Sequence, residues 1–585
     1  MKAWFKRSLQ NPRVLLLALA LACVLLLPSL RVWPLMDDAV HAYIQRDPSW
    51  VHATPGSISY DLFRFADHDR ERTLAGLRDG LWPWWTAEDF RLAFCRPLAS
   101  LTHAFDYRVL GGATWLMHVE SLALYLLCVV LVHRLARRWL APLGAGVATL
   151  VFAVEDAHAM PVTWLANRNL VLAALFSLLA LERLSASTAR RTRAHIVAVC
   201  SFLLALASGE AGVSCLGLIG AYLLFVDDRP PRSRLLAAAP FGLVLLLWAL
   251  VVRSLGYGTH GGGFYIDPLA EVGTFLGALV VRLPILLAAQ LTLIPADLLA
   301  NLSPAQLQTM GGVCALVVGA LLAWLWPLFK RSSLARFGLL AMTLTAIPVC
   351  ATWPTDRVLF FPSIGAAFVW GALFDADAEA VRLRARRVLL GMVVVVHMLL
   401  PLLLLPARVW ILDATFHNTI LRTAKTLPDV PERSLIVVNT PDYLNVSNAA
   451  AVRALESGHS PYARARVLAI CTQIDCPLRR LDAHTLEIQN DRGFVGDPIS
   501  QVFRRASLPF EVGWTIDLGD VRVTVVEVLA DGRPKTVHYT FDSPLESDDY
   551  TWISWKDRAY AAFTLPAVGE TMTIPAVSLE QAYAP

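Results

Sequence analysis

Long apolar runs separated by short polar segments fill most of the first 405 positions of this 585-residue chain. A helix that crosses a bilayer needs about 20 mostly apolar residues, and shorter runs suffice where neighbouring helices cover the ends. The pattern therefore predicts a multi-spanning α-helical membrane protein with about eleven transmembrane helices. The predicted spans are residues 14–30, 116–132, 143–154, 170–181, 196–207, 213–226, 235–252, 313–328, 339–350, 361–373 and 388–405.

Positive charges between the runs predict the orientation of the chain. Lys2, Lys6, Arg7 and Arg13 precede the first run, and cytoplasmic loops are enriched in Lys and Arg, so we expect the N-terminus inside. A signal peptide is the competing interpretation, but no small-residue cleavage pattern follows the run, which favours an anchor. Asp37 then lies on the outer face.

Residues 274–295 form a twelfth apolar run that this topology does not count as a span. A full crossing would place the basic cluster from Arg382 to Arg387 outside, against the charge rule. Arg282 and Pro284 also interrupt the run. We therefore expect an interfacial or re-entrant element with both ends outside, which puts the C-terminus on the outer face.

The segments between and after the spans differ in character. Residues 34–115 read as an outer loop that lies on the membrane, with the indole rings of Trp82-Pro-Trp-Trp85 at the headgroup level. Residues 256–264 are too rich in glycine for a helix. From Ala407 the composition becomes that of a soluble domain.

The C-terminal segment alternates polar and apolar residues with the period of β-strands. Such runs occupy residues 521–526, 536–541 and 550–555, while 434–440 followed by 449–456 suggests a strand and then a helix. We expect a transmembrane domain at 1–406 and a soluble β-rich, α+β domain at 407–585. Cys471 and Cys476 are either a disulfide or two free thiols.

Composition agrees with lipid as the main solvent of the chain. Hydrophobic residues make up 56%, charged residues 17%, and the mean hydropathy is +0.52. The formal net charge of +4 is small, and the Lys and Arg residues fall in short clusters between the apolar runs, as topology signals do. No nucleic-acid partner is therefore expected. The cysteine spacing does not form a zinc site.

Charged residues gather in the loops that the charge rule places outside. Carboxylates at the lip of a membrane cavity can act as a base or bind a divalent cation, and arginines can recognise a phosphate headgroup with a fork of donors. The alternatives are a solvated loop start for the acids and snorkelling anchors for the arginines. The candidates are Asp37, Asp38, Arg96, Glu155, Asp156, Arg168, Glu210, Asp356 and Arg357.

Four sequence blocks resemble the GT-C superfamily of polyprenyl-phosphate-sugar-dependent glycosyltransferases, especially the protein O-mannosyltransferase branch and its relatives with TPR repeats. The blocks are Met36-Asp-Asp-Ala39, Cys95 to Gly111 leading to His118, Val151 to Arg168, and Asp356 to Gly365, with Ser208-Gly-Glu210 as a weaker fifth. The resemblance covers roughly the first 375 residues, and no TPR repeats follow.

The resemblance implies inverting transfer of a sugar from a polyprenyl-phosphate donor to a hydroxyl of a protein or glycan acceptor. An acid of the first outer loop would be the base, which assigns Asp38, by slight preference, or Asp37. Arg357, with Arg168 or Arg96, would bind the lipid phosphate. The chain departs from the relatives at three places. Glu155-Asp156 stands where they have a His-Pro pair, Met160 where they then have a Glu, and Gly209 where they often have a Lys. These differences leave the sugar and the acceptor open.

Two other classes of protein fit the same apolar bundle. An exporter or lipid flippase would also cluster charges inside it, and an envelope scaffold would need only the C-terminal domain for contacts. For a glycosyltransferase we expect a bacterial inner membrane, with the C-terminal domain in the periplasm, because no eukaryotic retention signal is visible.

Overall fold

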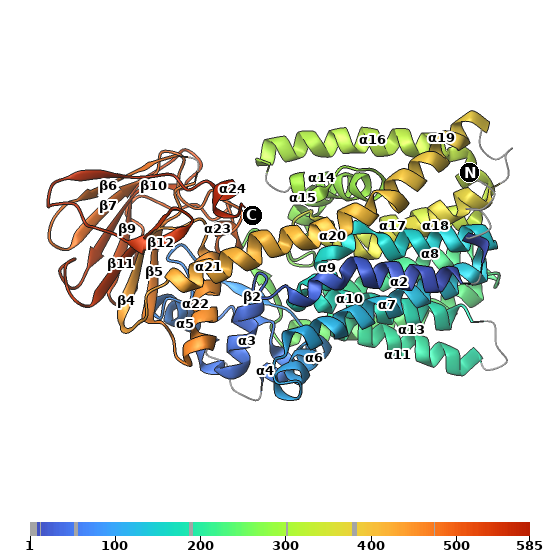
Figure 1. The fold of residues 1–585 in the computed structure, drawn as a ribbon, viewed down its shortest axis with the longest axis horizontal. Helices are drawn as coiled ribbons and strands as arrows, with labels where there is room; N and C mark the ends of the chain where they lie inside the picture. Colours follow the sequence, from blue (N-terminus) through green and yellow to red (C-terminus); the bar gives the residue numbers. More distant parts are fainter. Residues whose placement is uncertain are drawn as a thin grey trace. The chain divides into compact units, whose positions relative to one another are not determined.

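The computed structural model describes residues 9–11, 13–51, 57–186, 191–299, 302–376, 383–472 and 474–584, and the chain packs as two units (Figure 1). Unit 1 contains residues 1–32, 94–255 and 267–410, and unit 2 contains residues 33–93, 256–266 and 411–585. The predictions for Lys2, Lys6, Arg7 and Arg382 lie outside the described residues.

Unit 1 is a helical bundle. Its helices are α2 (Val14–Leu26), α6 (Pro97–Arg108), α7 (Thr114–Trp139), α8 (Pro142–Val154), α9 (Ala159–Thr163), α10 (Arg168–Leu184), α11 (Arg191–Ser208), α12 (Cys215–Phe225), α13 (Pro231–Ser254), α14 (Val272–Leu291), α15 (Ala296–Leu299), α16 (Pro304–Arg331), α17 (Ser333–Val349), α18 (Phe360–Asp375), α19 (Leu383–Val394) and α20 (Pro401–Leu412). Short 3-10 turns include η4 (Leu165–Asn167), η5 (Glu210–Ser214) and η6 (Asp356–Leu359).

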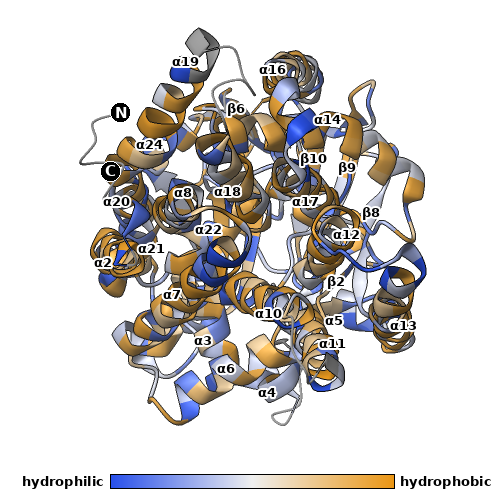
Figure 2. Cartoon of the chain, turned by 90° about the vertical axis from the view of Figure 1, so that its right-hand side faces the viewer, coloured by the Kyte–Doolittle hydropathy of each residue, from blue (hydrophilic) through white to orange (hydrophobic). Residues whose placement is uncertain are grey.

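The prediction of an integral membrane protein is confirmed. Eight helices in the described part of the chain are long and apolar enough to cross a membrane, or nine if the bent pair Pro142–Val154 and Asp156–Thr163 is one span. Three shorter apolar helices add to these, and the predicted count of eleven is not confirmed. Hydrophobic residues make up most of α13 and α16, which are coloured mainly orange in Figure 2, as expected for helices in contact with lipid.

The core of unit 1 is built around α18, whose span is 94% buried, and α10, whose span is 83% buried. Helices α17 and α18 approach closely at Gly365, where a Cβ atom would lie 2.3 Å from the Met342 backbone nitrogen. Small residues permit such backbone contact between helices, which gains dispersion energy where lipid offers no hydrophobic drive.

The segment predicted as an interfacial or re-entrant element contains α14, an unbroken helix of 20 residues that is long enough to cross a membrane. Arg282, in its middle, donates to the carbonyls of Cys350 and Thr352 just beyond the end of α17. Asp297, which follows α14, accepts the Asp356 N–H of the same region. The middle of α14 and its C-terminal flank thus meet one end of α17. The interfacial or re-entrant placement of this segment stays a prediction.

The described residues of unit 2 form three sheets. A three-stranded antiparallel sheet has the order β1-β2-β3, from Arg64–Asp67, Arg91–Ala93 and Gly258–His260. A six-stranded sheet has the order β13-β6-β7-β10-β9-β8, and a four-stranded sheet the order β12-β11-β4-β5. Their strands are β4 (Val430–Asn439), β5 (Tyr462–Ala469), β6 (Cys476–Arg480), β7 (Thr485–Gln489), β8 (Thr515–Asp517), β9 (Val521–Val528), β10 (Pro534–Phe541), β11 (Tyr550–Lys556), β12 (Ala559–Ala562) and β13 (Thr571–Ile574).

The helices of unit 2 flank these sheets. They are α3 (Asp38–Arg46), α4 (Ile58–Asp61), α5 (Arg70–Arg78), α21 (Asn418–Thr426), α22 (Tyr443–Ser457), α23 (Ser500–Phe503) and α24 (Leu579–Ala582). Helix α22 connects the parallel strands β4 and β5, as the sequence predicted for a strand followed by a helix. The predicted β-rich character is confirmed, and Cys471 and Cys476 form a disulfide.

The prediction that Trp82 to Trp85 lie at the membrane surface is wrong. Trp84 and Trp85 are only 3% and 2% exposed and belong to the core of unit 2. The Trp84 indole N–H donates to the Leu468 carbonyl, which satisfies its polar atom inside that core. The division of the chain at residue 406 remains a prediction, and the packed unit that holds the C-terminal segment also includes residues 33–93 and 256–266.

Candidate functional site

The acidic pair predicted as the base opens helix α3 in unit 2. Asp37 is the N-cap residue and Asp38 the first residue of the helix. The Leu35 N–H donates to Asp38 Oδ2 at 3.2 Å, and Asp38 is 2% exposed. The Asp37 side chain is 37% exposed. The two carboxylates therefore differ, because one is buried in the turn and the other is partly exposed.

His41 supports the Asp37 carboxylate from the next turn of α3. Its Nε2 lies 3.6 Å from Asp37 Oδ2, and its buried ring stacks on Phe65 and meets the edge of Phe63. A histidine one turn along a helix faces the same side as the N-cap residue. The ring is thus fixed beside the exposed acid.

Arg357 differs from the other arginines of the predicted outer loops. It lies in η6 and is half-buried, with its guanidinium carbon 5.3 Å from the centre of the Trp164 ring. Across the described ranges no carboxylate pairs with it. Trp164 precedes η4, so this contact joins the sequence block that ends at Arg168 to the block that begins at Asp356.

Arg408, in α20, was not predicted as a functional residue. Its three guanidinium nitrogens reach three carboxylates: Nε to Asp156 at 2.6 Å, Nη1 to Asp297 at 3.2 Å and Nη2 to Asp356 at 2.6 Å. The sequence signal was an arginine inside an apolar run, which is costly unless paired. The prediction omits Arg408 because the change in composition at Ala407 places this residue in the soluble domain.

The Arg408 network also fixes the backbone around η6. Asp356 Oδ1 accepts the Ala296 N–H at 2.6 Å, and the Asp356 N–H donates to Asp297 at 3.0 Å. Asp356 is the residue before Arg357. The network therefore holds the turn from which the Arg357 side chain extends.

Glu155 lies at the bend between α8 and α9 and is buried. Gln290, near the end of α14, donates to its carboxylate at 3.3 Å. Asp156 belongs to the Arg408 network described above. Glu155 and Asp156 are thus each held by a side chain of unit 1.

Arg168 is buried at the start of α10, and all three of its nitrogens bind protein acceptors. Nη1 donates to Asp106 at 2.6 Å and to Glu120 at 3.1 Å, Nε to Ser121, and Nη2 to the Met117 carbonyl. Burial raises the pKa of Asp106 to about 7, against the opposing charge of Arg168. In this conformation Arg168 ties α6, α7 and α10 together.

Arg96 and Glu210 form an ion pair of 2.9 Å between the turn before α6 and η5. The Arg96 guanidinium also lies over the Phe94 ring, at 4.4 Å from its centre. Their blocks are far apart in sequence, and the structure brings these two side chains together. The pair is half-buried, so neither charge is cut off from solvent.

A divalent cation at Asp37 and Asp38 requires further ligands. In the portion of the chain with described placement, the pair does not belong to any group of three or more His, Cys, Asp or Glu side chains close enough to share an ion. We therefore assign no cation to these two residues.

Comparisons with known proteins found no matching family model and no matching curated protein. Similar solved structures are the archaeal oligosaccharyltransferase AglB from Archaeoglobus fulgidus in complex with an inhibitory peptide and a dolichol-phosphate (14% identity, TM-score 0.42) and an Archaeoglobus fulgidus oligosaccharyltransferase in the apo form (13%, 0.37). The alignments cover 79% and 80% of this chain. The chain spans 65% of the length of each of these structures, and at these scores the likeness does not establish a common fold.

Proposed function

We propose that this protein is an integral-membrane glycosyltransferase that moves a sugar, with inversion, from a polyprenyl-phosphate donor to a hydroxyl of an extracytoplasmic protein or glycan acceptor. The observation that carries the proposal is Arg357, a half-buried guanidinium beside an indole ring and without a carboxylate partner in the described residues. The family resemblance assigns this residue to the lipid phosphate.

Arg357 suits an anionic headgroup for electrostatic reasons. An unpaired charge that is partly removed from water gains free energy when an anion arrives, whereas a paired one must first lose its partner. The guanidinium offers parallel N–H donors that match two phosphate oxygens. Trp164 limits the directions that the side chain can take, which lowers the entropy lost on binding.

The neighbouring acids decide where the phosphate would bind. Asp156, Asp297 and Asp356 would repel a phosphate, but Arg408 offsets part of their charge and holds Asp356 against the Ala296 backbone. We propose that Arg408 is a positioning residue, because it fixes the turn that carries Arg357. Arg168 and the Arg96–Glu210 pair would likewise be positioning residues for the neighbouring loops. Glu155 would position its loop through its hydrogen bond with Gln290.

The base belongs to the Asp37–Asp38 pair. Proton abstraction requires a carboxylate that the acceptor hydroxyl can reach, and Asp37 is far more exposed than Asp38. Our proposal therefore moves from Asp38, preferred from sequence, to Asp37 as the proton acceptor. Asp38 would hold the turn through the Leu35 N–H. The bacterial inner membrane and a periplasmic C-terminal domain are part of the same proposal.

Binding of polyprenyl phosphate to purified variants tests the role of Arg357. Arg357→Ala removes a charge-assisted interaction, so we expect affinity to fall about 10- to 100-fold. Arg357→Lys keeps the charge and loses the fork, so its affinity should lie between the two. Binding can be followed by quenching of tryptophan fluorescence in detergent micelles.

Arg336 provides a matched control. Its guanidinium carbon lies 5.3 Å from the centre of the Phe225 ring, a contact like that of Arg357, but it is at the N-terminal end of α17. Arg336→Ala should leave the affinity unchanged. Equal loss in the Arg336 and Arg357 variants, or no loss in Arg357→Ala, would refute the assignment.

A further inference from the structure

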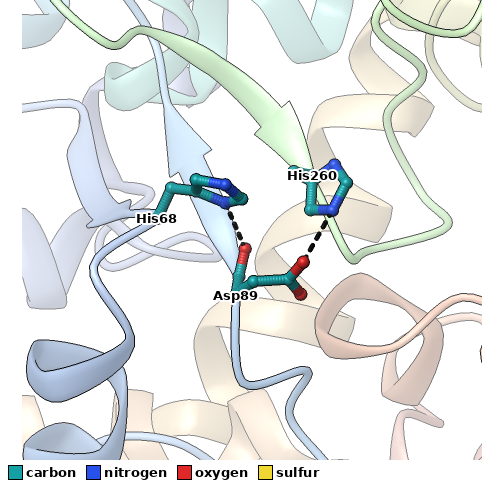
Figure 3. A group of neighbouring side chains, drawn as sticks. All are labelled: His68, Asp89 and His260. Carbon is teal, nitrogen blue, oxygen red and sulfur yellow. Dashed lines mark hydrogen bonds and ion pairs between the residues drawn. The ribbon is translucent and has the colours of Figure 1, made fainter.

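Two histidines and an aspartate meet at one end of the three-stranded sheet of unit 2 (Figure 3). His68 follows β1, Asp89 comes just before β2, and His260 ends β3. Their candidate ligand atoms all lie within 4.8 Å of one another. The register explains the meeting, because Arg91 in β2 is paired with Asp67 on one side and with His260 on the other.

The backbone fixes both the position and the tautomer of His68. Its N–H donates to the Phe90 carbonyl at 3.1 Å, and its φ of 71° is a left-handed conformation that few non-glycine residues adopt. Its Nδ1 lies 2.6 Å from the Asp89 carbonyl oxygen. A carbonyl only accepts, so Nδ1 carries the proton and Nε2 keeps its lone pair. Metal-binding histidines typically have this arrangement.

His260 and Asp89 already lie at nearly the spacing of two ligands on one ion. His260 Nε2 donates to Asp89 Oδ2 at 2.9 Å. Zinc bonds of about 2.0 to 2.2 Å at a tetrahedral angle would set these atoms about 3.4 Å apart. The pair would open by a few tenths of an ångström. His260 would change tautomer, giving up the Nε2 proton to solvent and taking one up at Nδ1, so that it binds as a neutral imidazole. Both side chains are partly exposed, so this movement meets little resistance.

The arginines around the group are already engaged. Arg70 pairs with Glu88 at 2.7 Å and Arg72 with Asp67 at 2.5 Å. Arg504 is held over the Phe510 ring and donates to the Leu508 carbonyl. These arginines therefore do not cover the two imidazoles, and a cation can reach them.

We propose that His68, Asp89 and His260 bind one divalent transition-metal ion, with Zn²⁺ as the best match, and that water takes the fourth position. Two imidazoles and one carboxylate are ligands that zinc favours, while calcium and magnesium prefer oxygen alone. The ion would clip together three segments separated by 21 and 171 positions. The inference does not rest on the proposed glycosyltransferase activity.

The clip would stabilise the sheet beside helix α3. Phe65, in β1, stacks on His41, the residue next to the Asp37 carboxylate. Holding the end of β1 would therefore keep that stack in place. The ion has a structural role in this inference and takes no part in a reaction step.

Zinc titration of the full-length protein tests the inference. The protein is purified in detergent, treated with EDTA, freed of the chelator and titrated with ZnCl₂ by calorimetry, and Co²⁺ absorption reports the coordination. We expect one equivalent of Zn²⁺ and a rise in the unfolding temperature. His68→Gln, His260→Gln and Asp89→Asn should each weaken binding at this site about 100-fold or more, because losing even a group that only hydrogen-bonds to a metal ligand costs about 10- to 100-fold.

His538→Gln is the matched control. His538, in β10, lies 2.8 Å from Glu487, in β7, and among the described residues this pair belongs to no group of three possible ligands. It should leave the zinc equivalent intact. A wild-type protein that takes up no zinc would overturn the inference whether or not the variants fold. One equivalent of Zn²⁺ retained by the His260→Gln variant, as expected if cysteines bind the ion, would also overturn the inference.

Discussion

At the residue scale, the role of each arginine depends on which acids lie beside it. Arg96, Arg168 and Arg357 all lie in predicted outer loops and look alike in sequence. In the structure Arg168 is buried among acceptors, Arg96 pairs with Glu210, and Arg357 rests on an indole ring. The sequence could place all three on one predicted face, but it could not tell them apart, because Asp106 and Glu210 come from distant segments.

This difference predicts opposite outcomes for two similar substitutions. Arg168→Ala leaves the buried Asp106 without its partner, which should lower the free energy of unfolding by about 3 to 5 kcal/mol. Arg357→Ala removes only a partly exposed ring contact, so the loss should be below about 1 kcal/mol. Chemical denaturation of both variants in the same detergent measures this, and equal losses would contradict the assignment of a structural role to Arg168.

At the element scale, local patterns predicted the strands well. Alternation marked β9, β10 and β11, because the period of a strand is written in its own residues. The packing of Trp82 to Trp85 in unit 2 was not predicted, because it depends on residues far away in the sequence. Trp84 bonds to Leu468, 384 positions away, and an indole that suits a headgroup region suits a protein core equally well.

The glycine-rich segment, residues 256–264, was correctly predicted to be non-helical. The sequence did not predict what this segment packs against. It contains β3, and Gly262 lies so close to residue 502 that a Cβ atom would be 2.2 Å from the Val502 carbonyl oxygen. Close backbone approach is a second reason for glycine beside conformational freedom. Chain segments distant in sequence decide this, so the local composition could not reveal it.

Gly262→Ala should therefore destabilise unit 2 by about 1 to 3 kcal/mol, the usual cost of overpacking. Gly277→Ala is the control, since nothing lies within 4 Å of its added carbon and alanine suits the interior of α14. The unfolding temperatures of both proteins are compared with that of the wild type. A Gly262 variant as stable as the Gly277 variant would show that the segment does not pack on residue 502 as described.

At the scale of the whole molecule, the sequence correctly predicted an integral membrane protein with a β-rich C-terminal segment. It did not predict that residues 33–93 and 256–266 pack with that segment. Hydropathy reports which residues avoid water, not which solvent-facing loops associate. The orientation follows from charge alone, so it needs its own test.

Reporter fusions test the orientation. A reporter after Asp228, between α12 and α13, should be active only in the cytoplasm, and one after Ala584 only outside. The Cys471–Cys476 disulfide should then be present in protein isolated without reductant, as expected for an oxidising compartment. A C-terminal reporter active only in the cytoplasm would refute the topology, and with it α14 as an interfacial element.

Sugar transfer by the purified protein tests the central claim most directly. The wild type is given a radiolabelled polyprenyl-phosphate sugar with protein and glycan acceptors, beside Asp37→Asn, Asp38→Asn and the double variant. We predict transfer by the wild type and a loss of about 10² to 10⁴ in rate in the double variant, with polyprenyl-phosphate binding retained. Asp37→Asn alone should account for most of that loss. Full transfer by the double variant would refute the base, and lipid translocation without transfer to any acceptor would replace the enzyme with a transporter.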